Sequence, residues 1–101
     1  RAQRDLERAF PSLALAVDSG YRLVDVRGAD EIEAMPLRGV AAMQIPSGEL
    51  PARTGELAGQ GRLLLVCASG RRSLHAAQQL RAAGLAGVYS LAGGIAALDH
   101  G

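Results

Sequence analysis

The sequence has a single cysteine, no tryptophan and only 3% aromatic residues. One cysteine excludes an internal disulfide and a multi-cysteine zinc site, and a lone thiol suits a reducing compartment. Two tyrosines and one phenylalanine are too few for the stacking surfaces that single-stranded nucleic acids favour. Lysine is also absent, and the eleven arginines are balanced by ten acidic residues, so a net charge of +1 predicts no polyanion-binding field.

Long apolar runs are missing as well. No run approaches the roughly 20 residues of a membrane-spanning helix, and no signal peptide is visible. We therefore expect a cytoplasmic protein with no membrane partner and no nucleic-acid partner. The 101 residues, 49% of them hydrophobic and 21% charged, suffice for one domain with one core. The chain begins with Arg1 rather than with methionine, which fits a piece of a longer protein.

Short apolar runs alternate with amphipathic stretches, which predicts an α/β fold with a central, mostly parallel sheet flanked by helices. Residues 63–66 form a continuous apolar run, as expected for a strand buried on both faces. Apolar positions at helical spacing between residues 6 and 17 predict a helix that Pro11 divides into two pieces. Asp30 is expected to cap a short helix at 28–35. Further strands are expected at 21–26, 39–45 and 88–91, and further helical segments at 55–57, 72–83 and 95–98.

The most informative segment joins the apolar strand to the helix at 72–83. Open α/β sheets bind their ligands at such carboxyl ends of strands. A tight turn there directs backbone N–H groups inward, and together with the unpaired amides of the helix start they form a cradle for negative charge. The segment consists of Cys67, Ala68, Ser69, Gly70, Arg71, Arg72 and Ser73.

Cys67 at the base of this cradle should have a stabilised thiolate, because helix N-termini and nearby arginines lower the pKa of a thiol. Gly70 allows the backbone to turn with positive φ, and the two small residues after the cysteine leave the mouth open. Arg71 and Arg72 can hold an incoming anion or brace the loop. The alternative is an inert buried thiol, since free cysteine is often interior. The position and the neighbours of Cys67 favour the reactive thiol.

Residues 67–73 resemble, position for position, the active loop Cys-x-x-Gly-x-Arg-Ser of the rhodanese-like sulfurtransferase domains. Residues 23–27 resemble the family's Leu-x-Asp-Val-Arg strand, which an acidic region at Glu31 follows, and residues 88–95 resemble its Val-Tyr-x-Leu-x-Gly-Gly-Ile segment. The family's Gly-His-Ile-Pro-Gly-Ala turn has only a histidine-free counterpart at 35–40. The resemblance implies a three-layer rhodanese-like domain at 12–101, with residues 1–11 as an N-terminal extension.

The resemblance also implies an activity. A sulfurtransferase of this kind moves a sulfane sulfur from an anionic donor such as thiosulfate to an acceptor, through a persulfide on Cys67. The backbone amides of residues 68–73 would stabilise the persulfide, and Arg71 would guide the donor. Arg72 would brace the loop against Asp25 or meet the donor at the rim. No metal and no organic cofactor are implied, and the acceptor would be a small thiol or a sulfur-carrier protein.

Several residues outside the loop have two interpretations each. In the family, the aspartate at the position of Asp25 helps to hold the loop, and basic residues such as Arg27 attract the donor. An ordinary ion pair at the end of a strand is the alternative. His75 is interpreted as a solvated helix residue rather than a catalytic base. The Gly93-Gly94 segment is predicted as a turn, which borders the pocket in the family.

Three other functions stay open. Some rhodanese-like domains are non-catalytic interaction modules, but most of those have lost the cysteine that this chain keeps. The chain also fits the sulfur-donating domain of a larger enzyme, such as an adenylyltransferase fusion that thiolates a sulfur-carrier protein. A cysteine-dependent phosphatase is the least favoured. Phosphatases place five residues between cysteine and arginine, whereas four separate Cys67 from Arg72, and the smaller loop suits one sulfur atom.

Overall fold

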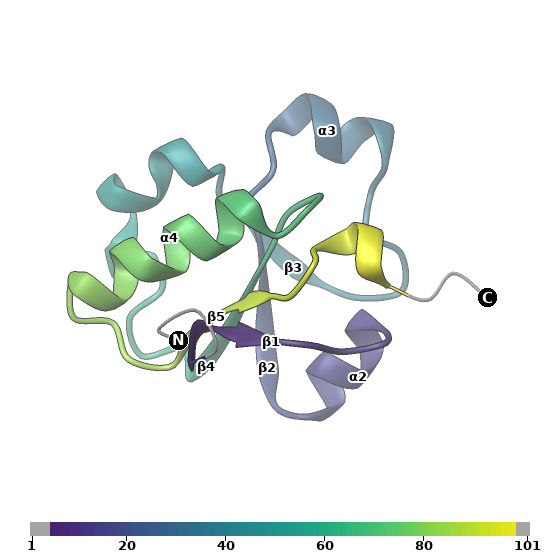
Figure 1. Ribbon diagram of the computed structural model, residues 1–101. Helices are drawn as coiled ribbons and strands as arrows, with labels where there is room; N and C mark the ends of the chain where they lie inside the picture. The colour runs from purple at the N-terminus through teal and green to yellow at the C-terminus, as the bar shows by residue number, and fades with distance from the viewer. Residues whose placement is uncertain (1–4, 99–101) are drawn as a thin grey trace.

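The apolar run of the sequence becomes the central strand of a five-stranded sheet in the computed structural model, which describes residues 5–98 (Figure 1). The strands lie in the order β1-β5-β4-β2-β3, and each neighbouring pair is parallel. This confirms the α/β class with a parallel central sheet. The strands are β1 (Glu7–Arg8), β2 (Tyr21–Asp25), β3 (Ala42–Gln44), β4 (Arg62–Val66) and β5 (Val88–Leu91).

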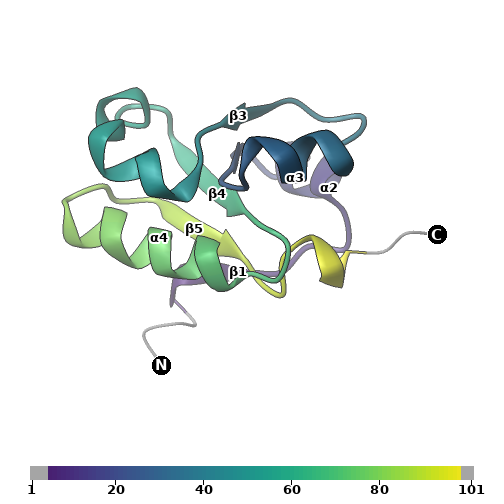
Figure 2. The same cartoon turned by 90° about the horizontal axis from the view of Figure 1, so that it is seen from above.

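Helices cover both faces of the sheet, which gives the three predicted layers. In Figure 1, α4 and η1 lie to one side of the strands and α2 and η3 to the other. Figure 2, the view from above, has α3 in front of the sheet, beyond the carboxyl end of β2. The α-helices are α2 (Leu13–Asp18), α3 (Ala29–Ala34) and α4 (Arg71–Ala82), and the 3₁₀ segments are η1 (Ser47–Ala52), η2 (Thr54–Glu56) and η3 (Ile95–Ala97). No helix within residues 5–98 is long and apolar enough to cross a membrane.

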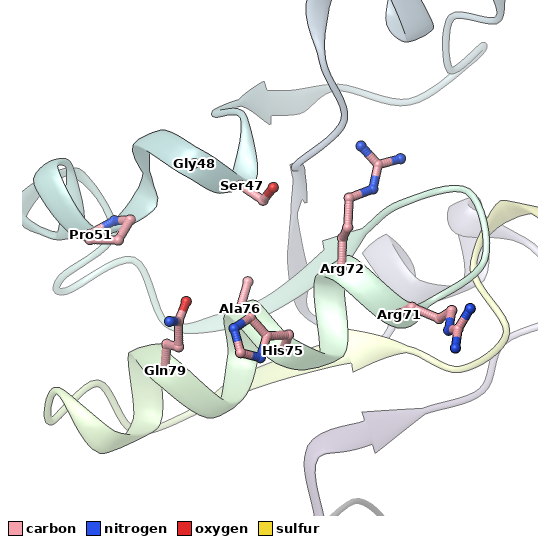
Figure 3. Close-up of a pocket in the computed structure, with 8 residues that line it drawn as sticks. All are labelled: Ser47, Gly48, Pro51, Arg71, Arg72, His75, Ala76 and Gln79. Carbon is pink, nitrogen blue, oxygen red and sulfur yellow. The ribbon is translucent and has the colours of Figure 1, made fainter.

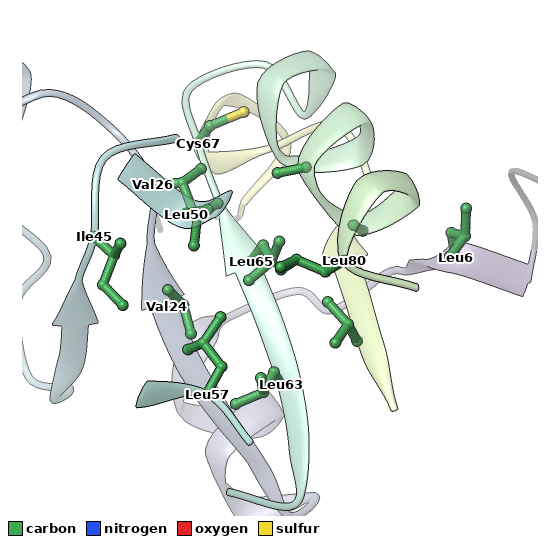
Figure 4. Close-up of a cluster of buried hydrophobic side chains, with 13 residues drawn as sticks. Leu6, Val24, Val26, Ile45, Leu50, Leu57, Leu63, Leu65, Cys67 and Leu80 are labelled. Atoms are coloured by element: carbon green, nitrogen blue, oxygen red, sulfur yellow. The ribbon is translucent and has the colours of Figure 1, made fainter. Parts of the chain in front are cut away.

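Two hydrophobic clusters hold these layers together, one on each face of β4. Leu63 and Leu65 point into the cluster beneath α4 and η1 (Figure 4), whereas Leu64 and Val66 point into the cluster beneath α2 and η3. All four side chains are fully buried. Because successive side chains of a strand point to opposite faces, a run that is apolar at consecutive positions suits a strand that lies between two helical layers. The continuous apolar run at 63–66 therefore fits the central place of β4 in the three-layer arrangement.

The N-terminal segment differs from the expected pair of helices. Its second piece is confirmed as α2; of the first piece Leu6 is helical, but Glu7 and Arg8 form β1 and pair with Ser90 and Leu91 of β5. The backbone groups on the outer side of β5 can hydrogen-bond to this segment, and that pairing outweighs the helical spacing. The division of the chain at residue 12 stays a prediction, although residues before it form an edge of the sheet.

The short helix after β2 begins as expected but is capped differently. Gly28, not Asp30, precedes its first residue, and the Gly28 N–H donates to Glu31 Oε1 at 3.0 Å. Asp30 was the wrong cap because it lies inside the first turn, where its charge favours the helix start without ending it.

Candidate active site

Cys67 directly follows β4, at the carboxyl end of the sheet, as the sequence predicts. The chain then turns within four residues into α4, which begins at Arg71, one residue before its expected start. Gly70 makes this turn with a φ of 90°, in the left-handed region that residues with side chains rarely adopt. The turn points Cys67 toward the first turn of α4 (Figure 4). Only 1% of the cysteine is exposed, so its sulfur lies at the base of the loop.

The loop brings hydrogen-bond donors to the sulfur. The backbone N–H groups of Gly70 and Ser73 donate to Cys67 Sγ at 3.1 and 3.4 Å. The Ser73 hydroxyl lies 3.3 Å from the same sulfur. These contacts belong to the tight turn and to the first turn of α4, whose amides have no partners within the helix. The cradle for negative charge that the sequence predicts is therefore present around Cys67.

Two opposing effects act on the pKa of Cys67. Burial raises the pKa of this thiol, because the charged form loses its solvation. Hydrogen bonds from the Ser73 hydroxyl and from the amides of Ser73, Gly70 and Ser69 lower it, and their sum outweighs burial. The pKa of Cys67 therefore lies below the usual value of a thiol. A lowered pKa favours the thiolate, the nucleophilic form of cysteine.

The Ser73 hydroxyl contacts a second hydroxyl, that of Ser90, which the sequence did not lead us to expect. Ser90 Oγ of β5 lies 2.7 Å from Ser73 Oγ, and both serines are fully buried. The signal that could have found Ser90 is its polar side chain between Tyr89 and Leu91 in the predicted strand at 88–91. Buried hydroxyls require partners, so a serine at such a place indicates a polar contact inside the core.

The turn after β5 forms another wall of the loop. The N–H groups of Ile95 and Ala96 donate to the carbonyls of Cys67 and Ala68 at 2.9 and 3.0 Å. Gly94 lies so close that a Cβ there would be 2.5 Å from Ala68 O and from the Gly70 nitrogen. The Gly93-Gly94 turn is thus packed directly against the cysteine loop, in agreement with its predicted place beside the pocket.

Arg72 braces the loop, but not against the residue expected. Its two terminal nitrogens donate to both carboxylate oxygens of Glu31 at 2.6 Å, which ties the start of α4 to α3. The hydrogen bonds from Arg72 and from the Gly28 amide lower the pKa of Glu31 to about 2. The predicted contact with Asp25 was wrong, because Arg72 projects from an exposed turn and Asp25 has another partner.

The partner of Asp25 is Arg27. The guanidinium of Arg27 donates to both carboxylate oxygens of Asp25 at 3.0 and 2.8 Å, and to the carbonyl of Met35 at 2.8 Å. The hydrogen bond to Asp25 raises the pKa of Arg27, and both side chains are buried. The pair joins the end of β2 to the end of α3. Attraction of a donor, the role implied for Arg27 by the family, does not fit a buried and paired side chain.

Arg71 is exposed, as Arg72 is, but it is not engaged as Arg72 is. No carboxylate of residues 5–98 lies within ion-pair distance of it, and its guanidinium points away from that of Arg72 (Figure 3). It borders a groove of about 520 Å³ between η1 and α4, which also passes the exposed His75. The groove is lined by Ser47, Gly48, Pro51, Arg71, Arg72, His75, Ala76 and Gln79. Within the described part of the chain, no cluster of His, Cys, Asp and Glu is placed to hold a metal ion.

Comparisons with known proteins point to one family. Residues 12–100 match the family model of the rhodanese-like domain. A rhodanese homologue from Thermus thermophilus has the same fold, with a TM-score of 0.69 and 34% identity, and the match covers 91% of this chain and 99% of that one. The human single-domain sulfurtransferase TSTD1 matches with a TM-score of 0.69 and 30% identity, over 90% of this chain and 92% of that one.

A third relative is YrkF of Bacillus subtilis, which is named as a candidate sulfur carrier protein. It is 33% identical over 78 residues, which are 77% of this chain and 41% of YrkF. The chain therefore spans less than half the length of this curated relative.

Proposed function

The chain belongs to the rhodanese-like domain family, and from this premise we propose that it transfers a sulfane sulfur from an anionic donor such as thiosulfate to a thiophilic acceptor. The observation that carries the proposal is the polar surroundings of Cys67 Sγ: two backbone N–H groups donate to it within 3.4 Å, and the Ser73 hydroxyl lies at 3.3 Å, where it can donate once the sulfur is anionic. Such a cradle stabilises the Cys67 thiolate before it attacks the donor and again when it leaves as the acceptor takes the outer sulfur.

The proposed reaction has two steps. In the first, the Cys67 thiolate attacks the outer sulfur of thiosulfate, the sulfur–sulfur bond of the donor breaks, and sulfite leaves with the bonding electrons. In the second, an acceptor nucleophile attacks the outer sulfur of the persulfide, and the Cys67 thiolate is the leaving group. The thiolate is regenerated, so no cofactor takes part, and ping-pong kinetics are expected.

The acceptor we propose is a small thiol or a sulfur-carrier protein. Support for a carrier comes from YrkF, whose name refers to sulfur carriage and which extends well beyond the matching part. A larger enzyme that holds this domain as its sulfur donor fits the same observation. We also propose a cytoplasmic location, because the lone Cys67 must stay reduced to accept sulfur.

Loading with thiosulfate tests the proposed function. We expect incubation to add one sulfur atom, about 32 Da for a persulfide, and a reductant to remove it. Intact mass spectrometry measures the change, and the single cysteine assigns it to Cys67. Cyanide should then release the sulfur as thiocyanate. An unchanged mass under conditions that load a known sulfurtransferase would contradict the proposal and favour a non-catalytic module.

Arg71→Ala tests how the donor is attracted. The exposed guanidinium has no acidic partner within residues 5–98 and should assist binding more than chemistry, so we expect the KM for thiosulfate to rise roughly two- to fivefold with kcat nearly unchanged. The difference from wild type should shrink with added salt, because an exposed charge is screened.

Arg22→Ala is the matched control, because it removes an exposed arginine near the amino end of β2, away from the loop. A fall in kcat with constant KM in Arg71→Ala would instead place Arg71 in the chemical step. Equal effects of the two variants would show that only the net charge matters.

A further inference from the structure

Three polar groups form a short chain inside the core. Cys67 Sγ lies 3.3 Å from Ser73 Oγ, which lies 2.7 Å from Ser90 Oγ. They come from the β4 end, from α4 and from β5, and each residue is at most 1% exposed. Among residues 5–98 the Ser90 hydroxyl contacts no other hydrogen-bonding group. This series of hydrogen-bonded groups therefore ends at Ser90, without access to water.

The series Cys67–Ser73–Ser90 holds a different number of hydrogens when the Cys67 sulfur is a neutral thiol and when it is an anion. Two contacts join the three groups, so two hydrogens can be shared between them. With a neutral thiol there are three hydrogens, one on sulfur and one on each hydroxyl, and one of them lacks an acceptor within the chain. With an anionic sulfur there are two, and both are used: Ser90 donates to Ser73, and Ser73 donates to the sulfur. A buried donor without an acceptor is costly, so the arrangement favours the anion.

Resting on the sulfur transfer proposed above, we propose that Ser90 is a positioning residue whose hydroxyl donates to Ser73 Oγ and thereby keeps the Ser73 hydrogen directed at the anionic sulfur of Cys67. The same orientation serves the thiolate before attack and the thiolate that leaves when the acceptor takes the outer sulfur. Without Ser90, the Ser73 hydroxyl loses the contact that orients it, and its oxygen lacks a buried donor. The backbone donors of Gly70 and Ser73 stay in place, so Ser90 adjusts the site rather than creating it.

Alkylation of the sulfur-free protein tests this role. The rate of reaction with iodoacetamide follows the thiolate fraction, and the lone cysteine makes the signal specific to Cys67. We expect Ser90→Ala to raise the pKa of Cys67 by roughly half a unit to one unit. The pH at which alkylation reaches half its maximal rate, the alkylation midpoint, should rise with it, and below this midpoint alkylation should be about three- to tenfold slower. The charged groups near the loop, Arg72 and the Asp25–Arg27 pair, are left unchanged by the substitution.

A double-mutant cycle with Ser73 separates positioning from a general loss of packing. Ser73→Ala removes the hydroxyl that contacts sulfur, so it should raise the midpoint at least as much as Ser90→Ala. In the Ser73→Ala background, Ser90→Ala should shift the midpoint no further, because its effect passes through the missing hydroxyl. Ser90→Thr, which keeps a hydroxyl, should keep the wild-type midpoint.

Val88→Ala is the matched control, because it shortens a fully buried side chain two residues away on β5. It should lower the unfolding temperature and leave the alkylation midpoint where it is.

An unchanged midpoint in folded Ser90→Ala would overturn the role of Ser90, as would equal shifts with and without the Ser73 hydroxyl. If Ser90→Ala does not fold, an unchanged midpoint in Ser73→Ala would overturn it equally. None of these measurements requires sulfur transfer, so failure here leaves the persulfide proposal standing, and failure to load sulfur is seen separately by mass.

Discussion

Cys67→Ser is expected to leave the protein folded and to abolish sulfur transfer completely. A serine hydroxyl fits the same small site and can accept the hydrogen bonds that Gly70 and Ser73 direct at the sulfur. It cannot carry a sulfane sulfur, and at neutral pH it is not ionised as a thiol can be. Incubation with thiosulfate should therefore add no mass, and thiocyanate formation should fall to the rate without protein.

The fold of the variant decides how this result is interpreted. Circular dichroism and thermal unfolding should give a midpoint within roughly 5 °C of wild type, because at most one hydrogen bond of ordinary strength changes. A folded variant that still turns over thiosulfate would show that the reaction does not pass through Cys67. Because the chain contains no second cysteine, such activity would argue against a persulfide mechanism altogether.

The central part of the fold could be predicted because local and global signals agree there. The apolar run at 63–66 identifies a strand buried on both faces, and the helical pattern after it predicts α4 to within one residue at its start. The N-terminal strand was not predictable in this way. Glu7 and Arg8 form β1 because β5 lies beside them in the folded chain, and a two-residue pairing has no period for a sequence to display.

The active site shows the same difference between local contacts, which the sequence predicts, and long-range contacts, which it does not. Cys67, Gly70 and Ser73 lie within seven residues of the chain, so their convergence follows from one turn and one helix start. Of the partners from elsewhere in the chain, the Gly93-Gly94 turn was placed beside the loop by the family resemblance alone, whereas the side-chain partners Glu31 and Ser90 were not predicted. Arg72 meets Glu31 across 41 residues, and Ser73 meets Ser90 across 17. Contacts of this kind depend on how α3, α4 and β5 pack, and spacing within one segment carries no information on them.

Gly94→Ala is expected to cause a second large loss, although Gly94 has no side chain and takes no part in the chemistry. Its φ of 65° and ψ of −164° lie in a region that is essentially restricted to glycine. A Cβ there would also meet Ala68 O and the Gly70 nitrogen at 2.5 Å. Both are backbone atoms of the cysteine loop, so no side chain can rotate away, and the loop itself must move.

Movement of the loop separates the amides from the sulfur that they stabilise. A displacement of about 1 Å at a reacting group costs roughly a hundredfold in rate, so thiosulfate turnover by Gly94→Ala should fall by about that factor or more. Gly59→Ala is the control, because Gly59 also has a positive φ of 77° but no atom within 4 Å of its Cβ position. It should lose about 1–2 kcal/mol of stability to backbone strain and keep its turnover. If folded Gly94→Ala turned over thiosulfate as fast as Gly59→Ala, the close packing of this turn on the loop would not be what sets the cradle.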